Sequence, residues 1–176
     1  YFRYFVFLYS QCNLMNIAVF PGSFDPITLG HVDLVRRAVP LFDKIIVAVG
    51  VNLQKSTLFS LEKRLEWLKE VFKDYPEIEI TYFEGLTVRF CEKKNANYII
   101  RGLRNASDFD YEKTISQLNT IIGKDLETIF LISQPEYSHI SSTIVREIIK
   151  GNGDVSPFVP EIIARELIIV SNNNNI

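Results

Sequence analysis

The strongest constraint on the fold is a regular alternation along the chain. Short runs of β-branched and aromatic residues are separated by stretches in which apolar residues recur at helical spacing. Runs this short and this apolar are typical of strands buried on both faces, and such strands form parallel sheets. The predicted strands are residues 17–20, 44–49, 78–83, 98–100 and 128–132.

The segments between these runs predict helices. Leu61, Leu65, Leu68 and Phe72 recur at steps of four, three and four, which places them on one face of a helix. A second set with this spacing is Tyr111, Ile115, Leu118 and Ile122, and a third helix, with Val32, Val35 and Val39, ends near Pro40. The expected N-caps are Ser60 for one helix and either Ser141 or Ser142 for another, which covers residues 143–150 and ends at Gly151. A last helix is expected after Pro160. The alternation predicts an α/β fold: a single doubly wound, Rossmann-like domain, in which a five-stranded parallel sheet carries helices on both faces.

We expect one domain over residues 15–170. Residues 1–14 are rich in aromatic residues and allow three interpretations: a short targeting signal, an extra strand or docking arm, or an N-terminal extension outside the native core with Met15 as the true start. The last is the prediction made here. Residues 171–176 are mostly asparagine, and we expect a disordered polar tail.

Composition excludes several classes of protein. A chain of 176 residues buries enough surface to need no disulfides, and its two cysteines, Cys12 and Cys91, lie too far apart for a zinc knuckle. The formal charge of −2 argues against a nucleic-acid coat, and no apolar run approaches the roughly 18 residues that cross a bilayer. We therefore expect a reduced, cytoplasmic location, with no nucleic-acid or membrane partner.

Polar residues collect where the predicted strands end. The loop after the first strand runs from Pro21 to His31, and Lys55 follows the second. Arg101 and Arg104 follow the fourth, and a run of hydroxyl residues from Ser138 to Thr143 follows the fifth. The carboxyl ends of parallel strands meet at one edge of a sheet, where helix N-termini also point. Arginine, lysine, hydroxyl and glycine side chains at that edge predict a phosphate-binding site.

Two common phosphate loops are absent. The sequence contains no G-x-x-x-x-G-K followed by serine or threonine, and no G-x-G-x-x-G after the first strand. These absences argue against a P-loop kinase or ATPase and against most dinucleotide-binding dehydrogenases.

Five blocks in order resemble a known family. Thr28-Leu29-Gly30-His31 matches the T-x-G-H signature of the nucleotidyltransferase α/β superfamily, and residues 140–146 match its I-S-S-T-x-V-R signature. With Pro21–Pro26, Arg101–Arg104 and Asp108–Glu112, the chain from about residue 16 to 167 resembles the bacterial phosphopantetheine adenylyltransferases.

The resemblance implies transfer of AMP from ATP to 4′-phosphopantetheine, which gives dephospho-coenzyme A and pyrophosphate in coenzyme A biosynthesis. It also implies Mg²⁺ as cofactor, direct transfer without a covalent intermediate, a homohexamer, and feedback inhibition by coenzyme A. The residues agree in one respect: no pairing of a nucleophile with a base is evident, so catalysis is expected to be positioning and charge stabilisation.

Residue roles follow from the resemblance. His31, Lys55 and Arg101 are the expected catalytic residues, and Ser23, Lys55, Thr87 and Arg101 are expected to bind phosphopantetheine. No residue is assigned to a metal. Asp25 is expected to brace its loop, and Trp67 to pack in the core or at a subunit contact. The expected ATP-binding residues are Ser23, Phe24, His31, Gly102, Leu103, Arg104, Glu112, Tyr137, Ser138, His139, Ile140, Ser141, Ser142 and Thr143.

Two alternatives remain at this point. One is a sibling nucleotidyltransferase, acting on a mononucleotide or using CTP, and the other is a catalytically inactive nucleotide-binding regulatory protein. The block from Arg101 to Glu112 argues against the first, and the presence of His31, Lys55 and Ser142 argues against the second. The two neighbours of Lys55 depart from the family pattern: they are Gln54 and Ser56. The details of that loop therefore stay open.

Overall fold

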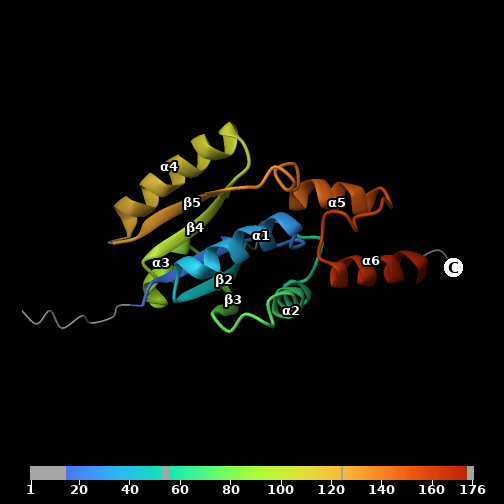
Figure 1. Cartoon of the computed structure of the whole chain (residues 1–176), viewed down its shortest axis with the longest axis horizontal. Coiled ribbons are helices and arrows are strands. Elements are labelled where there is room, and N and C mark those ends of the chain that lie inside the picture. The colour runs from blue at the N-terminus through green and yellow to red at the C-terminus, as the bar shows by residue number, and fades with distance from the viewer. Residues whose placement is uncertain (1–14, 53–55, 124, 174–176) are drawn as a thin grey trace, which may run out of the picture.

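The computed structural model describes residues 15–52, 56–123 and 125–173. The expectations for residues 1–14 and for Lys55 lie outside these ranges. One sheet of five parallel strands forms the centre of the described chain, in the order β3-β2-β1-β4-β5 (Figure 1). Its strands are β1 (Ile17–Gly22), β2 (Lys44–Val51), β3 (Ile78–Glu84), β4 (Tyr98–Leu103) and β5 (Glu127–Ile132). The helices are α1 (Leu29–Ala38), α2 (Leu61–Val71), α3 (Thr87–Lys93), α4 (Ala106–Ile122), α5 (Ser142–Lys150) and α6 (Glu161–Asn173), with a short 3₁₀ turn, η1 (Val39–Leu41).

This topology confirms the predicted doubly wound fold. The chain starts at the centre of the sheet with β1, winds outward through β2 to β3, and then crosses back to β4 and β5. The direction of winding therefore reverses between β1 and β4. Ligands of open parallel sheets bind at such a switch point, beyond the carboxyl ends of the strands.

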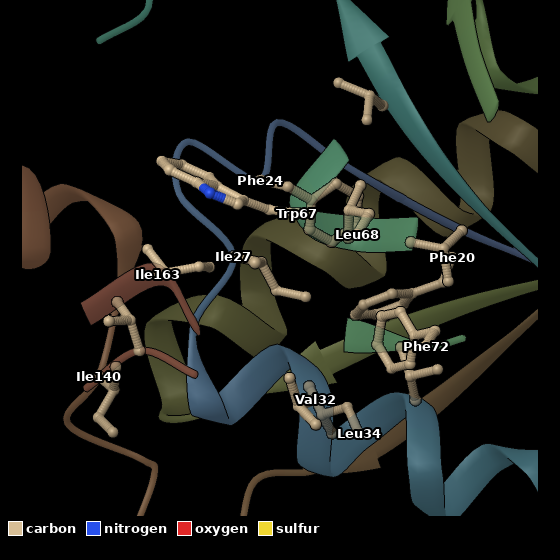
Figure 2. Packing of buried hydrophobic residues seen from close by; sticks show 14 of the residues in the cluster. Phe20, Phe24, Ile27, Val32, Leu34, Trp67, Leu68, Phe72, Ile140 and Ile163 are labelled. Atoms are coloured by element: carbon tan, nitrogen blue, oxygen red, sulfur yellow. The ribbon is translucent and has the colours of Figure 1, made fainter. Parts of the chain in front are cut away.

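Both faces of the sheet are covered. On β2, Ile45 and Val47 belong to one apolar cluster, whereas Ile46 and Ala48 belong to another, because alternate residues of a strand point to opposite faces. The larger cluster includes residues of α1, α2, α5 and α6, among them Trp67, which is buried as predicted for a core residue (Figure 2). The smaller cluster contains Val88 and Cys91 of α3.

Helix ends agree with the predicted capping residues. The side chain of Ser60 accepts a hydrogen bond from the Lys63 N–H at the start of α2, and Ser141 accepts one from the Ile144 N–H at the start of α5. Gly151 is the residue at which α5 ends. These caps satisfy backbone groups that have no partner within the helix.

The observed elements differ from the predicted ones in three places. The fourth strand continues from Ile100 to Leu103, because Arg101 and the two residues after it pair with β5; the apolar run alone stopped too early. The helix α3 was not predicted, since its seven residues are too few to show a helical period. Residues 171–173 belong to α6 rather than to a disordered tail, because each residue added to an existing helix gains a hydrogen bond at little cost. Residues 174–176 lie outside the described part.

Candidate active site

A cleft of about 220 Å³ lies at the switch point between β1 and β4. The end of β1 provides one wall and the end of β4 another, and the N-termini of α1 and α5 reach the cleft as well. Helix N-termini carry free N–H groups and a partial positive charge. The residues that line the cleft are Phe20, Pro21, Gly22, Thr28, Gly30, His31, Leu34, Arg101, Gly102, Arg104, Asp108, Glu112, Ser133, Tyr137, Ile140, Ser141 and Ser142.

His31 is held at the N-terminus of α1 by a capping box. The Thr28 side chain accepts from the His31 N–H at 3.4 Å, and the Thr28 N–H donates to His31 Nδ1 at 3.1 Å. Because Nδ1 accepts a backbone hydrogen bond, the ring proton of a neutral His31 lies on Nε2. The ring also packs edge-on against Phe24, at 5.2 Å between centroids.

The imidazole of His31 is neutral near pH 7. Burial, together with the positive charges of the nearby Arg104 and Arg101 guanidinium groups, lowers its pKa to about 4. A neutral imidazole whose proton is on Nε2 donates one hydrogen bond and brings no charge of its own. His31 is therefore suited to hydrogen bonding with an oxyanion.

Each arginine of the cleft is paired with a carboxylate of α4. Arg101 forms a two-point ion pair with Glu112, including Nε to Oε2 at 2.7 Å, and donates from Nη1 to the Pro21 carbonyl at 3.0 Å. Arg104 pairs with Asp108 through Nε at 2.8 Å and Nη2 at 3.0 Å. Glu112 is the carboxylate that was expected near the nucleotide. In this structure it is buried and bound to Arg101.

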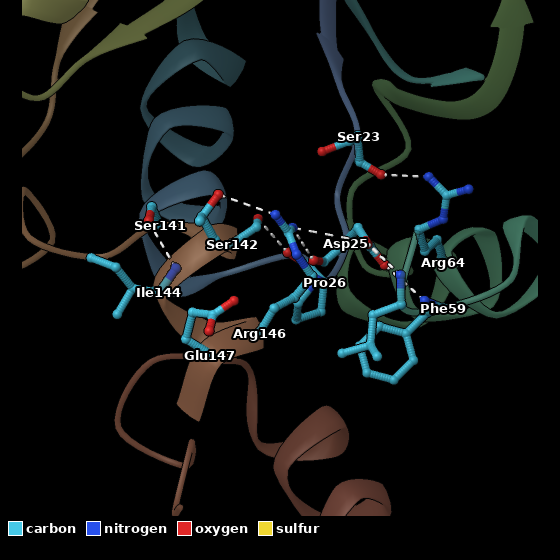
Figure 3. Close-up of polar contacts among 12 residues, drawn as sticks. Ser23, Asp25, Pro26, Phe59, Arg64, Ser141, Ser142, Ile144, Arg146 and Glu147 are labelled. Atoms are coloured by element: carbon cyan, nitrogen blue, oxygen red, sulfur yellow. Dashed lines mark hydrogen bonds and ion pairs between the residues drawn. The ribbon is translucent and has the colours of Figure 1, made fainter. Parts of the chain in front are cut away.

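A network of buried polar groups fixes the loop after β1 (Figure 3). Both oxygens of Asp25 accept backbone N–H groups, from Leu58 at 2.8 Å and Phe59 at 2.9 Å, so Asp25 braces the loop as predicted. Arg146 of α5 donates to the Asp25 carbonyl at 2.8 Å, and Arg64 of α2 donates to the Ser23 carbonyl at 2.8 Å. The loop is thereby joined to α2 and to α5.

Nine of the residues expected at the site line the cleft: His31, Arg101, Gly102, Arg104, Glu112, Tyr137, Ile140, Ser141 and Ser142. Seven others are described but are not among the lining residues: Ser23, Phe24, Thr87, Leu103, Ser138, His139 and Thr143.

Several of these seven have structural partners. The Ser138 hydroxyl donates to the Pro135 carbonyl, the Thr143 hydroxyl accepts from Arg146, and the His139 ring contacts Phe158 edge-on. Phe24 is buried. A Cβ at residue 22 would lie only 2.8 Å from Cζ of the Phe24 ring, which explains the glycine at this position. Thr87 starts α3, which packs with the smaller apolar cluster.

Sequence reasoning assigned no role to three residues of the cleft. Ser133 is the first residue after β5, and Leu34 follows His31 by one helical turn with the spacing of a core residue. Asp108 stands four residues after Arg104, and this spacing, common for ion pairs, was the available signal.

The described residues contain no helix long and apolar enough to cross a membrane. Nor does this part of the chain contain a group of three or more histidine, cysteine, aspartate or glutamate side chains arranged to hold a metal ion.

Comparison with known proteins gives a consistent result. A family model described as cytidylyltransferase-like matches residues 19–148. A phosphopantetheine adenylyltransferase of Flavobacterium psychrophilum is 52% identical over 147 residues, which cover 84% of this chain and 97% of that protein. One from Caldanaerobacter subterraneus is 49% identical over 153 residues, covering 87% and 96%.

A solved structure shows the same fold. The nicotinic acid mononucleotide adenylyltransferase of Plasmodium falciparum, in complex with NaAD, matches with a TM-score of 0.62 and 16% identity, over 90% of this chain and 96% of that one.

Proposed function

The chain belongs to the cytidylyltransferase-like family and, within it, to the phosphopantetheine adenylyltransferases, and we propose that the cleft between β1 and β4 is where it transfers AMP from ATP to 4′-phosphopantetheine. The products are dephospho-coenzyme A and pyrophosphate, a step of coenzyme A biosynthesis. The observation that carries this function is the identity of about half of the aligned residues to relatives of that name, over nearly the whole length of those relatives.

We infer a direct, in-line transfer. An oxygen of the phosphopantetheine phosphate forms a bond to the α-phosphorus of ATP, and the bond from that phosphorus to the bridging oxygen breaks as pyrophosphate leaves. A phosphate monoester is already an anion at pH 7, so the attack needs no base to remove a proton. The neutral state of His31 is compatible with this route.

The proposed role of His31 is to donate from Nε2 to an α-phosphate oxygen as negative charge builds. Its Nδ1 is already engaged by the Thr28 N–H, which fixes the ring before substrate arrives. Donors that are oriented in advance stabilise a transition state without reorganisation. The N-termini of α1 and α5 supply further N–H donors for the triphosphate, and Ser141 adds a hydroxyl donor. The Ser142 hydroxyl donates to the Pro26 carbonyl at 2.8 Å, so Ser142 can contribute through its backbone N–H.

Arg104 is proposed to bind ATP, and Arg101 to bind phosphopantetheine while paired with Glu112. Both arginines line the cleft, and each retains N–H groups beyond those used by its carboxylate. The roles of Lys55, Ser23 and Thr87 toward phosphopantetheine remain predictions from the family resemblance.

Magnesium enters this proposal with the nucleotide. The described residues provide no cluster of ligands that could hold the ion alone. Mg²⁺ usually keeps several water ligands and binds through substrate phosphates with few protein groups. The residues of the cleft therefore fit a magnesium–triphosphate complex better than a magnesium site built from protein side chains.

Three further properties belong to the proposal. Coenzyme A contains the product and would compete for the same cleft, which supports feedback inhibition. Among the described residues Cys91 is free and buried, which agrees with the proposed reduced, cytoplasmic surroundings. Finally, α4 exposes Phe109, Leu118, Ile121 and Ile122, and an apolar surface of this kind supports assembly into the expected homohexamer.

Pyrophosphate release tests the proposed function. The purified protein should release pyrophosphate from magnesium–ATP only when 4′-phosphopantetheine is present, and dephospho-coenzyme A should form in equal amount. Turnover with nicotinate mononucleotide, or with CTP in place of ATP, would instead support a sibling nucleotidyltransferase. Nucleotide binding without any turnover would support an inactive regulatory protein.

A further inference from the structure

Asp108 makes an unusually complete contact with a single residue. Its carboxylate accepts three hydrogen bonds from Arg104: from the backbone N–H at 3.1 Å and Nε at 2.8 Å, both to Oδ2, and from Nη2 at 3.0 Å to Oδ1. The contact therefore restrains both the backbone and the side chain of Arg104.

Asp108 is itself held in place by the N-cap of α4. It lies in the first turn of α4, and its N–H donates to the side chain of Asn105, the N-cap, at 2.9 Å. The side chain of Asp108 is 21% exposed and that of Arg104 is 37% exposed, and both residues line the cleft. An exposed arginine loses considerable side-chain entropy when it binds an anion, and a bidentate carboxylate restrains it beforehand.

We propose that Asp108 is a positioning residue for AMP transfer: by holding Arg104 at three points it orients that guanidinium toward the ATP phosphates. This inference rests on the proposed function. It goes beyond it by assigning a role to a carboxylate, a group that would otherwise repel the anionic nucleotide. The hydrogen bonds from Arg104 also hold the pKa of Asp108 below its usual value, so the pair stays charged at neutral pH.

The test compares Asp108→Asn with Asp110→Asn. Asparagine has one accepting oxygen, so Asp108→Asn breaks the bidentate pair with little change of shape. Asp110 lies two residues further along α4, is exposed, and its carboxylate has no hydrogen bond or ion pair within the described ranges. Both substitutions remove one negative charge from the same helix, and only the first releases Arg104.

Asp108→Asn should raise KM for ATP and the Kd for magnesium–ATP by about tenfold, the usual effect of one lost charge-assisted contact. KM for 4′-phosphopantetheine and kcat should change less than threefold, and Asp110→Asn should leave all four values near those of the wild type. Kinetics follow pyrophosphate release, and calorimetry with magnesium–ATP alone gives the Kd.

A double-mutant cycle then asks whether Asp108 acts through Arg104. In an Arg104→Gln background the bidentate pair is already lost, so adding Asp108→Asn should weaken ATP binding no further. Equal tenfold losses in both backgrounds would overturn the proposal. So would an unchanged Kd in Asp108→Asn with only a lower melting temperature, which indicates a purely structural helix cap, or tighter ATP binding, which indicates that Asp108 competes with phosphate.

Asp108→Glu covers the case in which Asp108→Asn fails to fold. This substitution keeps the charge near the helix N-terminus but moves the carboxylate away from the Arg104 N–H. The variant should therefore remain folded and bind ATP severalfold more weakly; unchanged binding would count against the proposal.

If the wild-type protein itself fails to release pyrophosphate, the proposed function is wrong. Calorimetry of the variants still tests the effect of Asp108 on nucleotide binding.

Discussion

At the scale of single residues, His31 combines three properties that arise from different parts of the structure. The capping box with Thr28 fixes the ring, burial removes its charge, and its place at the N-terminus of α1 puts it beside other donors. A charged imidazole would bind the substrate phosphates strongly in the ground state as well. A neutral donor contributes mainly where charge increases, which is the requirement for raising kcat.

Replacing His31 by alanine should therefore slow the chemical step. Loss of one oriented donor costs on the order of 10²–10³ in rate, so His31→Ala should lower kcat by about that factor. ATP should still bind with modestly weaker affinity, because Ser142, Arg104 and the helix N-termini remain. Steady-state kinetics and calorimetry measure the two effects, and His31→Asn should retain part of the rate because an amide can also donate. A kcat near the wild-type value, or an adenylylated protein detected by mass spectrometry after incubation with ATP, would contradict the assigned role.

The ionisation of His31 gives a second prediction. In the free protein its ring should stay neutral until the pH falls to about 4, as measured by ¹H–¹⁵N NMR of the imidazole. Arg104→Gln should raise that pKa, because Arg104 contributes to lowering it. An unchanged pKa in this variant would show that burial acts alone.

The same shift makes stability depend on pH. The unfolded chain takes up a proton on His31 near the ordinary histidine pKa of 6.5, whereas the folded protein does not until about 4. The free energy of unfolding should therefore fall as the pH is lowered through this window and change little from this source above it. In His31→Asn, that part of the pH dependence should be absent from urea unfolding curves.

At the scale of secondary-structure elements, the cleft depends on how closely β4 approaches α1. A Cβ at Gly102 would lie 2.3 Å from Leu34 Cδ1, so any larger residue would have to displace the buried Leu34 side chain. Gly102 was expected among the ATP-binding residues from the family resemblance, and the structure adds a packing reason for the glycine. The position of Arg101 and Arg104 relative to His31 follows from the same contact, because the arginines flank Gly102.

Gly102→Ala should accordingly destabilise the protein by about 1–3 kcal/mol, the usual cost of overpacking, because the new methyl group displaces the buried Leu34 side chain. Calorimetric or urea unfolding measures this loss. Adding Leu34→Ala to Gly102→Ala should cost less than Leu34→Ala costs alone in the wild type, because the new methyl group fills part of the space. Gly151→Ala is the matched control, since a Cβ there has ordinary contacts at 3.5 Å; equal losses at both glycines would refute the packing explanation.

At the scale of the whole molecule, the distribution of apolar surface is uneven. Ile121 on α4 is 81% exposed, and Glu112 is the buried residue of that helix. The helix that carries Asp108 and Glu112 therefore has few buried apolar contacts to hold it. In the proposed homohexamer, subunit contacts over α4 would also support the carboxylates that hold both arginines.

Ile121→Lys should reduce the assembly state measured by light scattering, because a lysine in a buried subunit contact is costly. Ile168→Lys on α6 provides the control, being the same change at another exposed isoleucine. We expect the Ile121 variant to lose activity along with assembly. A wild-type protein that is monomeric at the concentrations assayed, or an Ile121 variant that assembles normally, would rule out this surface as the contact.

Removal of residues 1–14 tests the predicted extent of the domain. All five strands and every residue that lines the cleft lie from Ile17 onward. A chain beginning at Met15 should therefore keep its melting temperature within a few degrees and its full turnover. A large loss of either would show that the first 14 residues belong to the folded domain.

Much of this protein was determined by local patterns in its sequence. Strands of β-branched residues, helices of period 3.6 and serine caps depend on neighbours within a few positions, and all five strands were predicted in order. The edge of the sheet that bears the site followed as well, because parallel strands place their carboxyl ends together. His31, Arg101 and Ser142 were located on that basis together with the family signatures.

Only the tertiary structure decided which of these groups meet. The two-point pairing of Arg101 with Glu112 is seen only in the folded chain, as is the absence of Ser138, His139 and Thr143 from the lining of the cleft. The neutral state of His31 likewise depends on burial and on two arginines some 70 residues away along the chain. Packing of whole elements brings these groups together, and a local pattern does not show how elements pack. The contact of Arg104 with Asp108 is the exception, because a spacing of four residues is typical of an ion pair on a helix.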